Sequence, residues 1–330
     1  MSNTQGGFAK RLEASWFEPF GLLSAVMLPL SGIFWLLSAF NRLLFRVGIK
    51  KAYHSPVPVI VIGNISVGGN GKTPMVIYLA DLLKTEGKRV GIISRGYGSQ
   101  PPSTPFSVNT DTPTNVGGDE PVLLAKRTGC PVVIGGDRKA SIEYLMSEHQ
   151  IDIILSDDGL QHYALGRDIE LCIVDAKRGH GNGLLIPAGP LREGTWRLNS
   201  VDLIVYNGEQ ANECAYQLEA TGLFQVANEQ ILAPPFKAGV ALSAIGNPQR
   251  FYDSLLAHQV LVTKTYHFRD HHKFVPEDIP SAEVVYMTEK DAVKCSAFAH
   301  EQCYYLRVDA KPNEQLEQQL TKLLKDKGVL

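Results

Sequence analysis

A glycine-rich stretch between an expected strand and an expected helix, GNISVGGNGKTP at residues 63–74, most narrows the folds open to this chain. The run VPVIVIG at 57–63 is short and rich in β-branched residues, which is typical of a buried strand. Residues 75–89 carry apolar side chains at helical spacing. A strand, a glycine-rich turn and a helix in this order indicate a P-loop NTPase-like α/β fold.

Residues 66–73, called here the phosphate loop, match the second half of the pattern Gly-x-x-x-x-Gly-Lys-Ser/Thr and depart from it at Ser66, where the first glycine usually stands. Glycines inside the loop supply the backbone freedom that amide groups need to turn toward phosphate. We expect Lys72 to reach the β- and γ-phosphates and Thr73 to bind Mg²⁺. The expected nucleotide-binding residues are Ser66, Val67, Gly68, Gly69, Asn70, Gly71, Lys72 and Thr73.

The rest of the chain alternates between expected strands and helices, which predicts a doubly wound, mostly parallel sheet. Further strands are expected at 89–94, 131–136, 151–156, 169–175 and 201–206, with a helix at 141–149. Beyond about residue 220 the pattern loosens into a smaller α/β lobe, with expected elements within 239–259, 282–294 and 303–309 and a closing helix at 313–326. We therefore predict a membrane-associated segment at 1–50, a nucleotide-binding core at 51–220 and a smaller lobe at 221–330.

The N-terminal stretch from 19 to 41 contains no charged residue and is long enough to cross a hydrocarbon core of about 30 Å. More Lys and Arg follow it than precede it, so the positive-inside rule places the bulk of the chain in the cytoplasm. Pro29 and Gly32 in mid-run leave open a bent helix that lies in one leaflet. A buried helix of the protein core is the alternative, although the stretch lacks the polar stripe that most such helices carry.

Composition excludes some classes of function. The chain has 32 Lys and Arg against 34 Asp and Glu, so no overall positive charge favours nucleic-acid binding. Its five cysteines form no C-x-x-C pair, which argues against a zinc site or a disulfide framework and fits a reducing compartment.

An acidic pair, Asp157 and Asp158, directly follows the apolar run 151–156. Carboxylates at the end of a strand next to a phosphate loop are typical magnesium ligands, so we expect the pair to serve the metal and catalysis. A simple turn before Gly159 is the alternative. The string TEKD at 288–291 has the wrong spacing for a guanine reader, which favours ATP.

A kinase also needs a base for the acceptor hydroxyl, outside the phosphate loop. VGGDEP at 116–121 places Asp119 and Glu120 in an expected glycine-flanked loop, and FRDHH at 268–272 places an aspartate beside two histidines. Either could instead be an ordinary polar loop.

Taken together and in order, the motifs resemble those of the tetraacyldisaccharide 4'-kinase family of lipid A biosynthesis. They are GNISVGGNGKTP, SRGYG, GGDEP, GDRK, SDDGLQH, GNGLLIPAGPLRE, ALSAIGNPQRF, FRDHH and MTEKDAVK, and they cover nearly the whole chain. The resemblance implies transfer of the ATP γ-phosphate to the 4'-hydroxyl of a tetraacyldisaccharide 1-phosphate, which gives lipid IVA at the cytoplasmic face of the bacterial inner membrane. It implies ATP and Mg²⁺ as cofactors, a glycolipid substrate and no obligate protein partner.

The resemblance also implies roles for single residues. Lys72 and Asp158 would be catalytic, Thr73 and Asp157 would bind the metal, and Asp119 would be the base. Its partner would be His271, with His267 and His272 as alternatives. Contacts to substrate or phosphate are expected from Arg95, Tyr97, Arg138, His162, Asn182 and Arg192.

Two other classes of function remain open from the residues alone. One is a membrane-associated P-loop ATPase that regulates a protein partner, and the other is a nucleotide-binding scaffold without catalysis.

Overall fold

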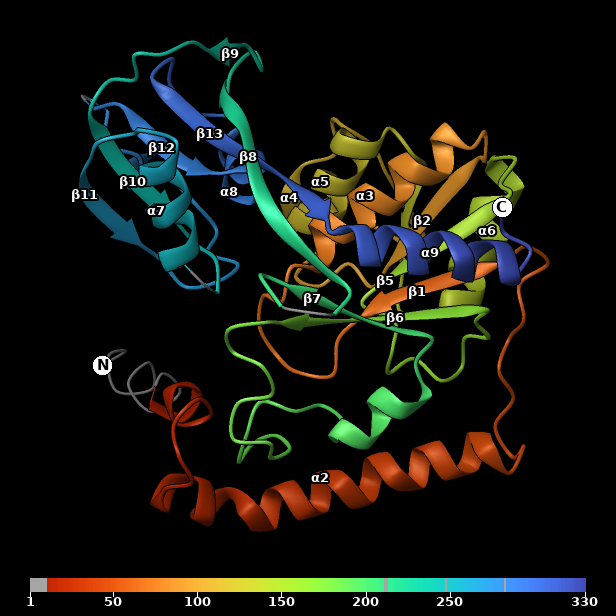
Figure 1. The fold of residues 1–330 in the computed structure, drawn as a ribbon. Coiled ribbons are helices and arrows are strands. Elements are labelled where there is room, and N and C mark those ends of the chain that lie inside the picture. Colours follow the sequence, from red (N-terminus) through yellow and green to blue (C-terminus); the bar gives the residue numbers. More distant parts are fainter. Residues whose placement is uncertain (1–10, 211–212, 247, 282) are drawn as a thin grey trace. The chain divides into compact units, whose positions relative to one another are not determined.

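The computed structural model describes residues 11–210, 213–246, 248–281 and 283–330, and the chain forms two compact units (Figure 1). Unit 1 consists of Met1–Lys72, Leu155–Gln217 and Pro312–Leu330, and unit 2 of Thr73–Ile154 and Leu218–Lys311. The division into segments 1–50, 51–220 and 221–330 stays a prediction.

Unit 1 is built on buried parallel strands. β1 (Val59–Gly63) pairs with β6 (Ile169–Asp175), and β6 pairs with β7 (Leu203–Asn207), in parallel in both cases. Every residue of β1 and β6 is buried, as expected for parallel strands covered on both faces. β7 pairs with the first residues of β8 (Ala215–Gln225), and the 3₁₀ helix η1 spans Thr195–Ser200.

Helix α9 (Glu314–Asp326) closes the chain in unit 1. Its buried residues Leu316, Leu320 and Leu324 recur every four positions, so they form one apolar stripe. Asn313 caps the helix by accepting a hydrogen bond from the Leu316 amide at 2.9 Å.

The first half of unit 2 contains strands β2, β3 and β4 with helices around them. β2 and β4 are parallel, and β3 joins β4 in antiparallel fashion. β5 (Ile153–Asp157) runs from unit 2 into unit 1. The bounds of the other elements are α3 (Lys72–Thr85), β2 (Val90–Ser94), β3 (Phe106–Val108), α4 (Thr114–Gly117), α5 (Asp119–Thr128), β4 (Val132–Ile134) and α6 (Arg138–Glu148).

The second half of unit 2 has a parallel strand order β11-β10-β12-β13. Side chains of β10 alternate between two apolar clusters: Val240 and Leu242 pack into one, and Ala241 packs into the other. Both faces of this sheet are therefore covered. The elements are β9 (Ile231–Leu232), β10 (Gly239–Ser243), α7 (Pro248–Ala257), β11 (Val262–His267), η2 (Pro276–Asp278), β12 (Val285–Thr288), α8 (Glu289–Cys295) and β13 (Cys303–Pro312).

The structure confirms the predicted α/β class with a mostly parallel sheet. It corrects one local expectation, because Asp119 and Glu120 form the first turn of helix α5 and not a loop. Gly118 precedes them with φ of 85°, a conformation that lets the chain turn sharply into the helix.

Helix α2 (Leu22–Arg46), the long helix at the bottom of Figure 1, buries polar side chains and exposes apolar ones, the reverse of a helix in a soluble protein. Its buried residues are Ser24 and Ser31, whereas large apolar side chains such as Leu22 (83% exposed) face outward. Within the described part of the chain, α2 is the one helix long and apolar enough to cross a membrane. This pattern indicates membrane association, since polar groups of a lipid-facing helix turn toward protein.

Polar contacts fix α2 to residues 181–193, called here the docking loop. The Ser31 hydroxyl donates to the Leu185 carbonyl at 2.8 Å and accepts from the Ala188 amide at 3.0 Å. Asn182 donates to the Ser24 hydroxyl at 3.3 Å. The two serines thus satisfy polar groups that apolar side chains in their places would leave unpaired.

We expect Ser31→Ala to lower the free energy of unfolding by about 1–3 kcal/mol, because it leaves the Ala188 amide and the Leu185 carbonyl without this partner. Urea denaturation of the detergent-solubilised protein measures the change. The matched control is Ser38→Ala, whose hydroxyl lies on the same helix and donates to the Trp35 carbonyl at an exposed position. It should shift stability by less than about 0.5 kcal/mol. Equal effects of the two substitutions would contradict the docking role of Ser31.

Candidate active site

The phosphate loop leaves the carboxyl end of β1 and is held by contacts within unit 1. Ser66 accepts a hydrogen bond from the Asn70 side chain at 2.8 Å, and both residues are buried. The Val67 amide donates to the Pro190 carbonyl at 2.8 Å. Ser66 therefore closes the loop through its side chain, where a glycine would offer none.

Three donors hold the carbonyl groups of the loop. Arg178 donates to the Gly69 carbonyl at 2.7 Å, Asn207 to the Asn70 carbonyl at 3.0 Å, and the Tyr216 hydroxyl to the Gly71 carbonyl at 2.6 Å. A trans peptide places its N–H opposite its C=O. The following amides, those of Asn70, Gly71 and Lys72, consequently point away from these donors, where they are available to an anion.

Backbone conformation also requires glycine in the loop. Gly68 and Gly71 have φ values of 102° and 89°, which L side chains rarely adopt. A Cβ atom on Gly71 would overlap the Asn207 amide nitrogen and the Tyr216 hydroxyl. The second glycine of the pattern is thus fixed both by its φ and by the two donors beside it.

Two cations meet at Asp158. Lys72 Nζ lies 3.5 Å from Asp158 Oδ1, and Arg192 Nη1 lies 3.0 Å from Oδ2. Burial alone would raise the pKa of Asp158, but the charges of Lys72 and Arg192 outweigh it and hold the pKa below its ordinary value. Asp158 has a left-handed backbone, with φ of 52°, which is uncommon outside glycine. The structure therefore brings together three of the predicted site residues as one ion-paired cluster.

Asp157 and Thr73 offer hard oxygen donors that suit Mg²⁺. Asp157 is the last residue of β5 and its side chain is buried, while Thr73 lies in the first turn of α3. Among the described residues, no group of three or more His, Cys, Asp or Glu side chains could hold a metal by itself. A small donor set fits Mg²⁺, which keeps several waters and binds through one or two carboxylates together with phosphate.

In unit 2, Asp119 and His271 form a hydrogen-bonded pair, called here the dyad. His271 Nδ1 lies 3.0 Å from Asp119 Oδ2 and 3.3 Å from Oδ1. Asp119 is 6% exposed at the start of α5, and the Tyr97 ring lies beside His271, with 5.1 Å between ring centroids. Of the histidines considered from the sequence, His271 is the one that meets Asp119, whereas His272 Nε2 lies 2.9 Å from Asp278 Oδ2.

The dyad is electrostatically coupled. Burial would raise the pKa of Asp119, but the hydrogen bond from His271 and the charge of Lys290 hold it well below its usual range. The hydrogen bond to Asp119 raises the pKa of His271, although burial and the charge of Lys290 oppose this. The carboxylate is therefore ionised, and the imidazole titrates above its ordinary pKa.

The remaining predicted residues of unit 2 lie in different settings. Arg95 and Tyr97 are exposed. Arg138 is 3% exposed at the start of α6 and donates to the Gly135 carbonyl at 3.1 Å, so it supports the chain locally. Any contact of these three residues with substrate stays a prediction.

Two further predicted residues of unit 1 hold loops. The His162 amide donates to the Gly159 carbonyl at 3.0 Å, and the His162 carbonyl accepts from Arg167. Asn182 joins α2 to the docking loop through Ser24 and the Ala188 carbonyl. Their roles toward substrate likewise stay predictions.

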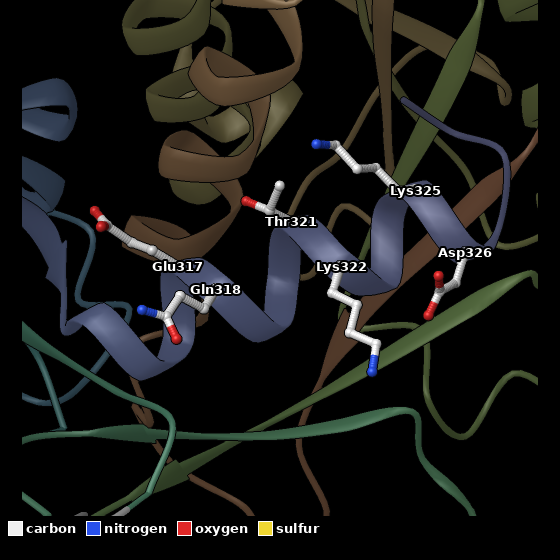
Figure 2. Close-up of a pocket in the computed structure, with 6 residues that line it drawn as sticks. All are labelled: Glu317, Gln318, Thr321, Lys322, Lys325 and Asp326. Carbon is white, nitrogen blue, oxygen red and sulfur yellow. The ribbon is translucent and has the colours of Figure 1, made fainter.

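Sequence reasoning missed several residues that the structure places in these clusters. Arg178, Asn207 and Tyr216 lie outside the phosphate-loop motif, and no spacing connects them with it. Lys290 stands in the motif MTEKDAVK, which contributed to the family resemblance without a role for the lysine. The depression along α9 contains none of the predicted site residues and is lined by Glu317, Gln318, Thr321, Lys322, Lys325 and Asp326 (Figure 2).

Comparison with known proteins gives one consistent result. The family described as tetraacyldisaccharide-1-P 4'-kinase, LpxK, matches residues 23–325. The tetraacyldisaccharide 4'-kinase of Pseudoalteromonas translucida is 48% identical over 97% of this chain and 98% of its own length. That of Haemophilus influenzae is 47% identical over 86% of this chain and 87% of its own.

A solved structure agrees with the sequence relatives. The crystal structure of LpxK from Aquifex aeolicus in complex with ATP superposes with a TM-score of 0.77 at 28% identity, and covers 93% of this chain and 99% of that one. Similarity of sequence and of fold over nearly the whole length shows that the chain belongs to the tetraacyldisaccharide 4'-kinase family.

Proposed function

We propose that this chain transfers the γ-phosphoryl group of ATP to the 4'-hydroxyl of tetraacyldisaccharide 1-phosphate and so forms lipid IVA. The observation that carries the proposal is the Asp119–His271 dyad, because transfer to a hydroxyl needs a proton acceptor outside the phosphate loop. Membership of the kinase family and a phosphate loop with oriented amides support it.

Unit 1 supplies the phosphate-binding residues. The amides of the phosphate loop bind the phosphate oxygens, and Lys72 and Arg192 neutralise negative charge there. Both cations are already paired with Asp158. Asp158 keeps them oriented and lowers the net positive charge, so a phosphate meets cations whose positions are set in advance.

Thr73 and Asp157 are the proposed Mg²⁺ ligands. When bound, the ion would neutralise charge on the phosphate oxygens. The side chains supply one hydroxyl and one buried carboxylate, both of them oxygen donors of the kind Mg²⁺ prefers.

Unit 2 supplies the proton acceptor. We assign Asp119 as the group that takes the proton from the 4'-hydroxyl, and His271 as the group that orients Asp119 through its Nδ1–H. The two titrate as a coupled pair, so the proton affinity of the dyad as a whole sets its capacity as a base. Protonated His271 would bind the Asp119 carboxylate more tightly and weaken it as an acceptor.

We further propose that α2 lies along the membrane surface and does not cross the bilayer. Contacts with the rest of unit 1 occur near both ends of the helix: Ser24 meets the docking loop, and Arg42 lies 3.4 Å from Glu193 and over the Trp196 ring. Eighteen residues of helix separate Ser24 from Arg42, or about 27 Å. Because α2 is held to the rest of unit 1 over that length, a bilayer-spanning α2 would draw the attached residues of unit 1 into the hydrocarbon core. The proposed location is the cytoplasmic face of the inner membrane, where the glycolipid substrate lies.

The test of the function is mass spectrometry of the lipid after incubation of purified protein with Mg²⁺, ATP and the disaccharide 1-phosphate in detergent. The expected product is one phosphoryl group heavier, and Lys72→Ala and Asp119→Ala should abolish it. Consumption of ATP with unchanged lipid would replace the proposal with an ATPase that regulates a partner.

For nucleotide binding, we expect Gly71→Ala to weaken ATP affinity by about tenfold or more. A left-handed backbone alone costs an alanine roughly 1–2 kcal/mol, and the overlap with Asn207 and Tyr216 adds to this. Calorimetric titration measures the affinity. In the same loop, Gly69→Ala adds a methyl group with no heavy atom within 4 Å and should stay nearer to wild type. Equal losses in the two variants would show that the close approach at Gly71 is unimportant.

For the chemical step, we expect Asp119→Asn to lower kcat by roughly 10²–10⁴-fold, the range for loss of a general base, with little change in ATP affinity. Steady-state kinetics with both substrates and a separate ATP titration distinguish the two effects. Asp111→Asn, at an exposed position in the same unit, serves as the control and should leave kcat unchanged. Undiminished turnover in Asp119→Asn would remove Asp119 from the mechanism.

A further inference from the structure

Lys290, which stands in the motif MTEKDAVK, lies among three carboxylates beside the dyad. Its Nζ donates to Glu120 Oε1 at 2.9 Å and lies 3.5 Å from Asp270 Oδ1 and 3.7 Å from Asp119 Oδ2. Only 17% of the side chain is exposed. One ammonium group is thus shared by the dyad aspartate and by the residues that follow Asp119 and precede His271 in the chain.

The local fold gives no reason of its own for a lysine at this position. Lys290 is in the first turn of α8, where the helix dipole disfavours a cation. Thr288 caps the helix by accepting from the Asp291 amide at 3.1 Å, so the cap does not need Lys290. Burial would lower the pKa of Lys290, but the charges of Glu120, Asp119 and Asp270 raise it well above its ordinary value. The lysine is therefore charged because of these carboxylates.

A second ion-pair cluster holds α8 against α5 independently of Lys290. Arg127 of α5 lies 2.6 Å from Glu289 Oε2 and also pairs with Asp309 of β13. Arg307 Nε lies 3.6 Å from Glu289 Oε1. Because Glu289 is engaged by these arginines, Lys290 is left to the Asp119 side of the helix. The helix pair would keep its contact if the charge of Lys290 were removed.

We propose that Lys290 is a positioning residue of the dyad: its ammonium keeps Asp119 ionised and limits how strongly Asp119 holds His271 as an imidazolium. This deepens the proposed function and rests on Asp119 being the base. Lys290 Nζ and His271 Nδ1 both contact Asp119 Oδ2, so the ammonium and the imidazole compete for one oxygen.

The sign of the effect follows from the charges that face the dyad. Glu120 and Asp270 are negative, and Lys290 is the cation in contact with them. Lys294 also lowers the pKa of Asp119, but it is itself 2.7 Å from Asp291. Since the charge of Lys290 lowers the pKa of both Asp119 and His271, its removal raises both. His271 would then stay protonated to higher pH.

The first experiment is an NMR titration of ¹³C-labelled histidine in the full-length protein, with the His271 signal identified from its loss in His271→Asn. In Lys290→Gln the titration midpoint of His271 should move to higher pH, and in Lys290→Arg it should stay near wild type. The matched control is Lys273→Gln, which removes an exposed cation two residues from His271 and should leave the midpoint unchanged. An unchanged midpoint in Lys290→Gln, or an equal shift in the control, would overturn the proposal.

A further variant keeps the proposal testable if Lys290→Gln does not fold. Glu120→Gln removes the acceptor of the Lys290 hydrogen bond and frees the ammonium to act on Asp119, so the His271 midpoint should move to lower pH. A shift of the midpoint to higher pH, or no shift, would count against Lys290 as the group that sets the protonation of His271.

The second experiment is the pH profile of kinase activity. Lys290→Gln should lower kcat by roughly 10²-fold, as a displaced catalytic group does, and should move the acid limb of the profile to higher pH, with KM for ATP little changed. Lys290→Arg should restore the limb. A uniform loss at every pH would indicate a merely structural role. The NMR midpoint of His271 does not depend on turnover, so it tests this inference separately from the kinase activity. If the midpoint shifts in Lys290→Gln but the wild-type protein does not phosphorylate the lipid, the proposed function has failed and the role of Lys290 beside the dyad stands.

Discussion

The buried parallel strands of unit 1 are the constraint on which the phosphate-binding cluster depends. β1 ends at Gly63 and leads into the phosphate loop, and β5 ends at Asp157. β6 ends at Asp175, three residues before Arg178, and β7 ends at Asn207. Because β1, β6 and β7 run parallel, their carboxyl ends lie at one edge, and the Asp158 amide joins the end of β1 by donating to the Ile62 carbonyl at 2.8 Å. The loop cation, the acidic pair and the three donors to the loop carbonyls thus come from five separate parts of the sequence.

This arrangement explains what the sequence could and could not predict. The strands were recognisable because buried parallel strands are continuous apolar runs, and the ends of such runs locate Asp157 and Asp158. Asn207 also ends a strand, but an asparagine there has no chemical signature of its own. Tyr216 reaches the Gly71 carbonyl from the segment of β8 that pairs with β7, and no local pattern in the sequence reveals that pairing. Contacts that arise from strand pairing are therefore invisible to motif reasoning, even when the strands themselves are predicted.

The error at Asp119 has a related cause. The glycines of VGGDEP suggested a loop, yet Gly118 supplies the turn and the next residue already starts a helix. An acidic first turn is favourable for a helix, so Asp119 and Glu120 suit that position on local grounds as well. The dyad then requires β11 and the turn after it to bring His271 to this helix end, and no pattern in residues 262–267 predicted a strand there. Asp119 and His271 were therefore predicted as partners from the family resemblance, because the spacing of the two residues in the sequence does not connect them.

Two of the four described residues other than glycine that have positive φ are Asp158 and His271, which belong to the two proposed catalytic clusters. Such a backbone is uncommon for residues other than glycine, so the surrounding contacts help to hold it. At Asp158 the two cations do so, and at His271 the side chains of Asp119 and Asp270 do, the latter accepting from the His271 amide at 3.0 Å. In each cluster charged partners therefore hold a strained residue in place. The electrostatics of each cluster and its backbone geometry therefore depend on each other, and the charge on Lys290 acts on His271 beside Asp119, which both side chains contact.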